Sequence, residues 1–226
     1  MRLLGIDFET TGLDPEKDKI IEVGAILYDW ETKQPVKIMS EFISCENNNL
    51  PTKITKLTGI NPFIWDNYGI KKEKAFFELS LLVSKADYII AHNASFDKSF
   101  FDKEITSEKQ WICSRMDIDY PLEITTRKLT YLAAEHNIIN PFRHRAVFDV
   151  LTMMEIVKQY DIKKIIERSK SPTITIQALV SYEEREKAKD AGFHWEAKSK
   201  TWQMLIKECD LQNKNFDFKI KKGGVI

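Results

Sequence analysis

The segment LLGIDFETTGL, residues 3–13, decides the fold. Its apolar part, Leu3–Phe8, is predicted to form a buried β-strand that ends in a Thr-Thr-Gly break. Side chains alternate between the two faces of a strand, so Asp7 and Glu9 leave the same face. Two carboxylates about 6.6 Å apart along a strand can converge on a hard cation such as Mg²⁺ or Mn²⁺. We therefore expect a site for a divalent cation at the end of this strand.

The D-x-E spacing alone does not identify such a site. The same spacing recurs at three places where we expect solvated surface: Asp14/Glu16, Asp29/Glu31 and Asp102/Glu104. The pair in the first strand differs because it interrupts an apolar strand and stands just before a glycine turn. Its position therefore marks this pair as the candidate.

Outward from this segment, the pattern of apolar residues predicts an α/β domain. Two further strands, Lys19–Trp30 and Val36–Cys45, would form an antiparallel meander with the first. Beyond them we predict helices at Lys72–Ala86, Ser95–Glu104, Arg127–His136 and Ala146–Tyr160, and short strands at Tyr88–Ala91 and Trp111–Arg115. Three strands followed by alternating helices and strands indicate a mixed sheet.

The chain is longer than one small domain needs, since 226 residues suggest a main domain with an appendage. We expect a main domain at residues 1–162, a charged linker at 163–172 and a small α+β domain at 173–226. The small domain is predicted to contain a strand at Thr173–Val180, a helix opened by the capping-box spacing of Ser181–Glu184 and closed by Gly192, a hairpin at Phe193–Ile206 and an edge strand at Phe216–Ile220.

Composition excludes several classes of protein. Apolar residues make up 43% and charged residues 30%, which excludes a disordered or collagen-like chain. Lys+Arg and Asp+Glu number 34 each, so any nucleic-acid partner must be held by a local site rather than by a global positive field. The cysteines are odd in number and widely spaced (Cys45, Cys113, Cys209), which predicts a reducing compartment without a disulfide framework or zinc site. We see no signal sequence and no apolar run of about 20 residues, so we expect a cytoplasmic protein with no membrane partner.

Two histidine motifs each adjoin a predicted core element: HNASFD at residues 92–97 and HRAVFD at residues 144–149. Both contain H-x-x-x-x-D, so the spacing alone does not decide which histidine is functional. Asp97 could also be a carboxylate that simply favours the first turn of a helix. Asp149 lies among apolar residues, where a carboxylate is costly unless it is paired or binds a metal. This cost favours a functional role for Asp149.

Aromatic and basic residues alternate in the predicted small domain: Phe193, His194, Trp195, Lys198, Lys200 and Trp202, followed later by Lys219, Lys221 and Lys222. Two interpretations stay open. The residues could contact single-stranded nucleic acid, because such binders combine stacking rings with basic groups. Alternatively, the two tryptophans are the core of a domain that has little else to bury.

Taken in order, the motifs DFETTGL, AHNASFD and HRAVFD resemble those of the DnaQ-like superfamily of 3′–5′ exonucleases, in the subgroup with four acids and a histidine (DEDDh). Within it, the sequence is most similar in appearance to exonuclease X and to the proofreading epsilon subunit of bacterial DNA polymerase. The resemblance covers roughly residues 1–160. It implies a ribonuclease H-like mixed sheet flanked by helices.

The resemblance also implies roles for single residues. Four carboxylates would bind metal, and they are Asp7, Glu9, Asp97 and Asp149. His144 would be the general base, whereas His92 matches a structural or substrate-contacting position. The residues implied to surround the terminal nucleotide are Thr10, Thr11, Gly12, Leu13, His92, Asn93, Ala94 and Phe96.

The implied activity is hydrolysis of the terminal phosphodiester of DNA, at single-stranded or frayed 3′ ends, with release of nucleoside 5′-monophosphates. Four clustered carboxylates would repel one another, so two divalent cations, Mg²⁺ or Mn²⁺, are the expected cofactors of a two-metal mechanism. Nucleic acid is the expected partner, with DNA 3′ ends preferred to RNA and a polymerase or repair complex as a further candidate. The alternatives are an exoribonuclease of the same superfamily and a non-catalytic subunit that binds 3′ ends or a polymerase.

Overall fold

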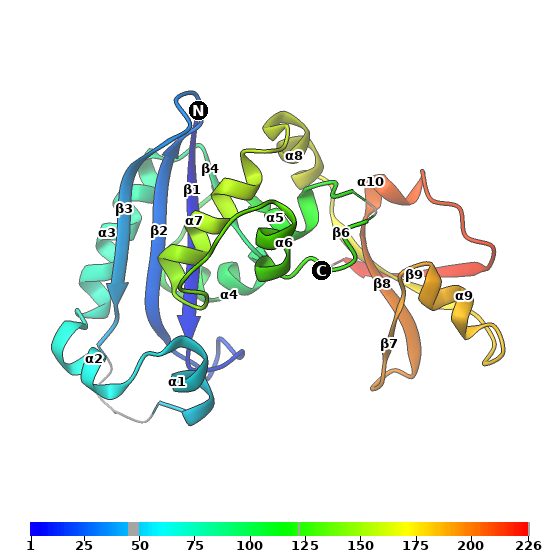
Figure 1. Ribbon diagram of the computed structural model, residues 1–226, viewed down its shortest axis with the longest axis horizontal. Coiled ribbons are helices and arrows are strands. Elements are labelled where there is room, and N and C mark those ends of the chain that lie inside the picture. The colour runs from blue at the N-terminus through cyan, green and yellow to red at the C-terminus, as the bar shows by residue number, and fades with distance from the viewer. Residues whose placement is uncertain (45–49, 122, 226) are drawn as a thin grey trace. The chain divides into compact units, whose positions relative to one another are not determined.

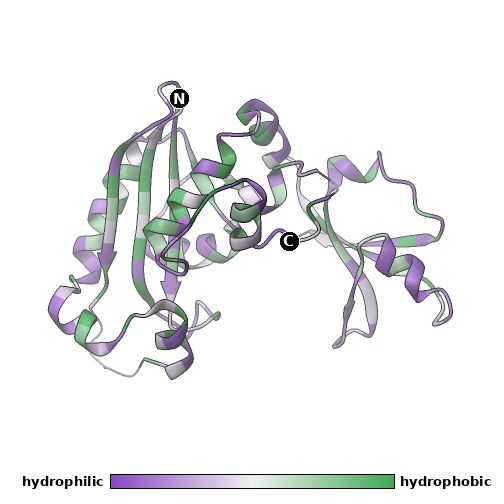
Figure 2. Cartoon of the chain, viewed as in Figure 1, coloured by the Kyte–Doolittle hydropathy of each residue, from purple (hydrophilic) through white to green (hydrophobic). Residues whose placement is uncertain are grey.

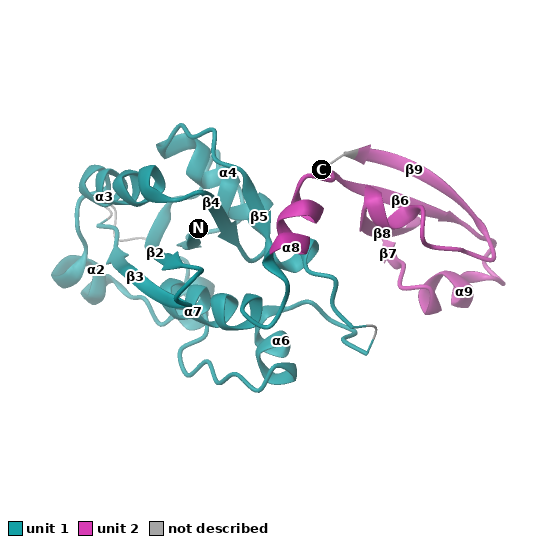
Figure 3. Cartoon of the chain, turned by 90° about the horizontal axis from the view of Figure 1, so that it is seen from above, with its two compact units in different colours: residues 1–162 teal, residues 163–226 magenta. Residues whose placement is uncertain are grey.

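A computed structural model describes residues 1–44, 50–121 and 123–225 of the chain. Cys45, one of the three cysteines considered above, lies outside the described residues. The chain divides into two compact units, residues 1–162 and residues 163–226 (Figure 3). In the described part of the chain, no helix has both the length and the apolar content that crossing a membrane requires.

The first unit is built on a mixed sheet, as the sequence predicted. Within the described residues the sheet has five strands in the order β3-β2-β1-β4-β5. β1 and β3 both pair with β2 in antiparallel fashion, whereas β4 is parallel to β1 and to β5. The strands are β1 (Arg2–Thr10), β2 (Ile20–Asp29), β3 (Gln34–Phe42), β4 (Tyr88–Ala91) and β5 (Trp111–Cys113).

Helices cover both faces of this sheet (Figure 1). On one face, α3 (Lys72–Lys85) and α4 (Ala94–Glu104) bury apolar residues against the side chains of Leu4, Ile6 and Phe8. On the other face lies α7 (Ala146–Val157). Because the sheet is covered on both sides, its central strands are largely hydrophobic (Figure 2).

Helix α7 begins in direct contact with β2, at Gly24. A Cβ atom on this glycine would lie 2.3 Å from backbone atoms of Ala146 and Val147, so only glycine lets the helix approach this closely. This contact fixes the start of α7 over the end of the sheet where β1 carries its acidic pair.

Four further helices of the first unit are short. They are α1 (Thr52–Thr58), α2 (Pro62–Tyr68), α5 (Ser114–Asp117) and α6 (Leu129–Glu135). Of these, only α6 was predicted, within the longer expected helix Arg127–His136. The other three have four to seven residues, which give too few turns for a clear apolar period. A local signal for α2 is nevertheless present: Asn61 caps the helix by accepting the N–H of Ile64, and Pro62 occupies the first turn.

The second unit has an antiparallel sheet with the strand order β7-β8-β6-β9. Its elements are α8 (Ile162–Ser169, which begins at the last residue of the first unit), β6 (Thr173–Leu179), α9 (Arg185–Asp190), β7 (His194–Glu196), β8 (Thr201–Lys207), α10 (Glu208–Leu211) and β9 (Lys219–Val225). The predicted hairpin is present as β7–β8. The small α+β character expected of this segment is confirmed.

The expected charged linker, residues 163–172, contains most of helix α8, on which Ile162 and Ile165 are buried. Two other expectations for this region need correction. Helix α9 starts at Arg185 rather than at the predicted capping box. The last strand starts at Lys219 instead of Phe216, because Phe216 packs with Phe218 against Phe193.

Candidate active site

The acidic pair of β1 lies on the sheet face that α7 covers. Glu9 pairs across the sheet with Glu22 of β2, and Glu22 is fully buried. Burial raises the pKa of Asp7 well above its ordinary value, and the nearby charges of Asp97, Glu9 and Asp149 raise it further. Carboxylates that come from β1, α4 and α7 therefore share one electrostatic environment.

Asp97 reaches this place from the first turn of α4. The pairing of β4 with β1 stops at Gly5, so the N–H of Phe8 lies beyond the parallel ladder. This N–H donates to Oδ1 of Asp97 at 3.1 Å, and the carboxylate is only 1% exposed. Burial raises the pKa of Asp97 to about 8. The hydrogen bond holds the side chain beside the acidic strand.

Asp149 lies in the first turn of α7 and is held from two sides. One oxygen accepts the side-chain N–H of Asn140 at 2.6 Å, and the other accepts the backbone N–H of His144 at 3.1 Å. Burial is the main cause of its raised pKa. The His144 backbone has φ +60°, in the left-handed region, so the Asp149 contact helps to hold a strained conformation.

Three potential ligands for a metal ion meet at this point. One ligand atom each from Glu9, His144 and Asp149 lies within 4.8 Å of the others. Burial, followed by the charge of Asp149, raises the pKa of Glu9 to about 8. A buried concentration of negative charge with oxygen donors fits hard divalent cations, which would hold all four carboxylates ionised.

An ion pair that the sequence did not reveal supports the start of α7. Arg145 contacts both carboxylate oxygens of the buried Glu22 at 3.0 and 3.2 Å, and the backbone N–H of Ala146 donates to the same carboxylate at 3.2 Å. The two partners are 123 residues apart in sequence. Glu22 does stand out in the sequence as a charged residue within the apolar run IIEVGAIL, and this was the available signal.

His92 is engaged in the scaffold. Its Nε2 lies 2.9 Å from the backbone oxygen of Arg127, and its Nδ1 lies 2.8 Å from the hydroxyl of Ser114. A carbonyl can only accept, so Nε2 carries the proton and Nδ1 accepts from Ser114. Burial lowers the pKa of His92 to about 4. Both ring nitrogens thus serve protein contacts, and the position favours a structural role over contact with substrate.

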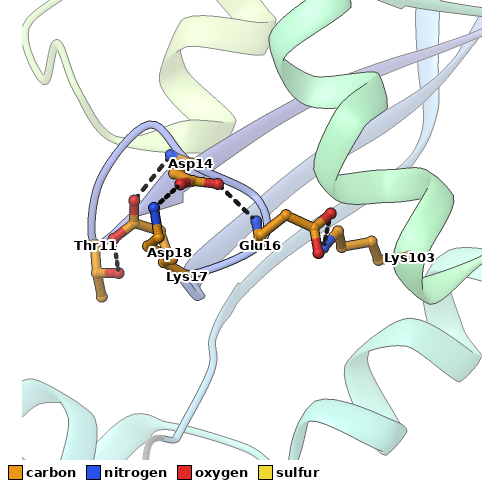
Figure 4. A network of polar contacts seen from close by, with 6 residues as sticks. All are labelled: Thr11, Asp14, Glu16, Lys17, Asp18 and Lys103. Carbon is orange, nitrogen blue, oxygen red and sulfur yellow. Dashed lines mark hydrogen bonds and ion pairs between the residues drawn. The ribbon is translucent and has the colours of Figure 1, made fainter.

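The loop after β1 is organised around two carboxylates, those of Asp18 and Asp14 (Figure 4). Asp18 accepts the hydroxyl of Thr11 at 3.0 Å and the backbone N–H of Asp14 at 2.8 Å. A Cβ atom on Gly12 would lie 2.4 Å from the Asp18 carboxylate, so a larger residue there would push Asp18 out of these hydrogen bonds. Thr10 is buried, and its hydroxyl donates to the backbone oxygen of Gly12 at 2.5 Å.

The next residue of this loop, Leu13, is 83% exposed. A large apolar side chain that is exposed to solvent, on a loop fixed by hydrogen bonds, is available to contact a ligand. Leu13 therefore fits the predicted contact with a terminal nucleotide.

The remaining predicted contact residues begin α4. Asn93 precedes the helix with φ +70° and accepts a hydrogen bond from Arg115 at 3.1 Å. Ala94 is buried, and the Phe96 ring packs against Phe100 with centroids 5.1 Å apart. These residues position the start of α4 and so support Asp97.

Comparison with known proteins agrees with this geometry. The exonuclease family typified by RNase T matches residues 4–157, which contain all four carboxylates and His144. The chain belongs to this exonuclease family. The match confirms the resemblance to the DnaQ-like superfamily and the mixed-sheet fold. Residues 174–222 match a domain of unknown function, DUF8626.

Three relatives illustrate the kinship. DNA polymerase III PolC-type of Thermotoga maritima is 29% identical over 197 residues, which cover 77% of this chain and 13% of the relative. DNA polymerase III subunit epsilon of Treponema pallidum is 28% identical over 162 residues, or 66% of this chain and 72% of the relative. The nuclease domain of 3′hExo, a DEDDh family member solved with rAMP, shares the fold with a TM-score of 0.59 at 20% identity, and the match covers 70% of this chain and 90% of that one. The chain thus spans only a small part of the PolC-type relatives.

Proposed function

We propose that this protein is a metal-dependent 3′–5′ exonuclease that removes nucleotides from single-stranded or frayed 3′ ends of DNA. The observation that carries the proposal is the convergence of Glu9, His144 and Asp149 beside Asp7 and the buried Asp97. A protein that only binds DNA ends gains nothing from a costly cluster of four carboxylates, one of them buried and three partly buried. In a member of an exonuclease family, this cluster is best explained by catalysis.

Asp7, Glu9, Asp97 and Asp149 would hold two divalent cations, Mg²⁺ or Mn²⁺. Bound there, such cations supply an activated water and stabilise the charge on the leaving oxygen. His144 would accept the proton of the attacking water, since imidazole exchanges protons near neutral pH. The contact between Asp149 and the His144 backbone would keep the imidazole next to the metal ligands. The product would be a nucleoside 5′-monophosphate.

The loop after β1 would hold the terminal nucleotide. Its hydrogen bonds around Asp18 fix the backbone, so the exposed Leu13 can pack on a base at little entropic cost. Thr10, Thr11 and Gly12 would present their backbone to the terminal sugar, and Phe96 would contribute to the same pocket.

The kinship with DNA polymerase III proteins favours DNA as the substrate and a replicative polymerase or a repair complex as a partner. RNA is the second candidate substrate, because the DEDDh neighbour was solved with a ribonucleotide. Base-stacking and phosphate contacts serve both polymers equally, and a contact with the 2′-hydroxyl would decide between them.

The deciding experiment is degradation of matched 5′-labelled single-stranded DNA and RNA with Mg²⁺, Mn²⁺ or EDTA. We expect a 3′-shortening ladder on DNA that disappears with EDTA and in Asp7→Asn. Asp102→Asn is the matched control, because it removes an exposed acid from a D-x-E pair outside the cluster. A ladder on RNA alone would show that the substrate is RNA rather than DNA. Tight binding without any ladder would support a non-catalytic end-binding subunit instead.

A further inference from the structure

The second unit contains a cleft of about 650 Å³ with an aromatic and basic lining. It lies where β6 and the loop after it face the β7–β8 hairpin. The side chains that define it are Tyr182, Arg185, Trp195, Lys200 and Trp202. None of the described residues that line it is acidic.

Each aromatic ring of the cleft contacts a neighbouring side chain, and two of the rings are open to solvent. Trp195 and Trp202 are directly paired across β7 and β8, and their ring centroids lie 5.7 Å apart. Trp202 packs on the core of the unit, whereas Trp195 is 51% exposed. Across the cleft, Tyr182 is 75% exposed. A tryptophan buttressed on one side and bare on the other offers a flat surface for stacking.

Core formation does not account for this exposure. The core of the second unit is closed by Phe193, whose ring lies 5.4 Å from Phe216 and 5.5 Å from Phe218. Trp202 completes that core at the edge of the cleft. Trp195 and Tyr182 are thus not part of this core. Of the two interpretations of the tryptophans, core filling describes Trp202 and ligand contact describes Trp195.

The charges of the cleft favour an anionic ligand. The Arg185 guanidinium lies 4.1 Å from the centre of the Tyr182 ring and extends the stacking surface with a positive charge, although it also forms an exposed ion pair with Glu186 at 3.7 Å. Lys200 lies in the turn of the β7–β8 hairpin, and no carboxylate of the described chain forms an ion pair with it. Flat rings flanked by cations are what single-stranded nucleic acids require, with bases on the rings and phosphates on the cations.

We infer that this cleft binds single-stranded nucleic acid by stacking bases on Trp195 and Tyr182, with Lys200 and Arg185 contacting phosphates. The inference rests on the proposed function, because it gives the strand that the first unit digests a second attachment point on the same chain. Two weak attachments on one chain raise the effective local concentration of the strand. The cleft therefore acts on substrate retention and leaves the chemical step unchanged.

The test is the affinity of the full chain for a labelled single-stranded oligonucleotide, measured by fluorescence anisotropy in EDTA. Without divalent cations there is no cleavage, and the acidic cluster lacks the cations that would hold phosphates, so the measured affinity comes from other surfaces. We expect Tyr182→Ala and Lys200→Glu each to weaken binding about 5- to 100-fold. Trp195→Ala should act in the same way, and Trp195→Phe should retain most of the affinity because a ring remains.

Matched controls separate the cleft from general effects. Tyr68→Ala removes another exposed tyrosine (64% against 75% for Tyr182) from the first unit, and Lys214→Glu makes the same charge change on the second unit outside the cleft. Both controls should bind as the wild type does. Equal affinity of cleft variants and controls would overturn the inference.

The catalytic proposal is tested separately. Cleavage of a dinucleotide, whose two nucleotides flank the single bond that the first unit cleaves, should have the same kcat in the wild type and in Lys200→Glu, while KM on a long strand rises in the variant. Binding through the cleft without any cleavage in Mg²⁺ or Mn²⁺ would leave the inference intact and remove the proposed function. Cleavage that the cleft variants do not affect would leave the proposed function intact and overturn the inference.

Discussion

At the scale of single residues, the buried pair of Glu22 and Arg145 is the contact that holds the catalytic end of α7. Arg145→Ala would leave the fully buried Glu22 carboxylate without its counter-charge. Loss of one partner from a buried pair costs about 3–5 kcal/mol, and we expect about 2–3 kcal/mol here because Arg145 is partly exposed. Urea unfolding measures this loss, and kcat should fall with it.

Glu22→Gln is the informative companion of this substitution. Glutamine keeps an oxygen for the N–H of Ala146 but carries no charge, so it should destabilise less than Arg145→Ala does. Wild-type unfolding free energy in Arg145→Ala would show that the pair does not support α7.

The two motif histidines should respond to substitution in opposite ways. His144→Ala removes the proposed base, and we expect kcat to fall about 10²- to 10⁴-fold with little change in Tm. His92→Ala deletes the bridge between Ser114 and Arg127 in a buried position, so Tm should fall by several degrees. Steady-state kinetics and thermal unfolding of both variants give the comparison. Wild-type kcat in His144→Ala together with lost activity in a folded His92→Ala would reverse the assignment of the base.

The candidate site was predictable from the sequence only in part. Asp7 and Asp149 stand out locally, because each is an acid among apolar neighbours. Asn140 and Arg145 carry no such mark. Asn140 lies in a polar loop, and its bond to Asp149 depends on the path of the chain into α7. Residues that position other residues become visible only when the fold brings their partners together.

At the scale of elements, the approach of α7 to β2 decides whether the site assembles. Gly24→Ala would place a methyl group 2.3 Å from the backbone of Ala146, which must move away. Overpacking of this kind costs about 1–3 kcal/mol, and the displaced α7 would carry His144 and Asp149 away from Glu9. We expect a lower Tm and a lower kcat, measured side by side.

Gly224→Ala is the matched control for this substitution, because a Cβ there meets no atom within 4 Å. This control substitution should leave Tm and kcat unchanged. A Gly24→Ala variant as stable and active as the control would contradict the close contact between β2 and α7.

Elements with a long apolar period were predictable, and short ones were not. Helices α3 and α7 have several turns, so their buried positions repeat clearly along the sequence. Helix α8 was taken as a linker because charged residues outnumber its apolar stripe. Its isoleucines are spaced for a helix, but only their burial shows that the stripe is used.

At the scale of the whole molecule, equal numbers of acidic and basic residues conceal a strong local imbalance. The net charge is zero, yet the first unit gathers four carboxylates in one place, with Asp97 buried and the other three partly buried. Composition could therefore not indicate how the protein would hold an anionic polymer. A cation-filled site in one unit and a basic, aromatic cleft in the other would supply what the net charge does not.

The buried carboxylates make the stability of the metal-free protein depend on pH with a definite sign. In the folded state Glu9 and Asp97 have pKa values of about 8, whereas unfolded carboxyls titrate near about 4. Between these values the folded state binds more protons than the unfolded state, so the free energy of unfolding falls as pH rises. Their protonated, uncharged forms stabilise the fold fully below about pH 4, and that stabilisation is lost as pH rises towards 8.

We therefore expect the Tm in EDTA to be lower at pH 8 than at pH 6, and Mg²⁺ to raise Tm more at pH 8, where it binds ionised carboxylates in place of protons. Thermal unfolding of the full chain at both values of pH, with and without Mg²⁺, measures both effects. Asp97→Asn is the control, because an amide does not ionise and the dependence of Tm on pH in EDTA should become shallower. A Tm in EDTA that rises from pH 6 to pH 8, or a slope that Asp97→Asn leaves unchanged, would show that these carboxyls are already ionised without metal.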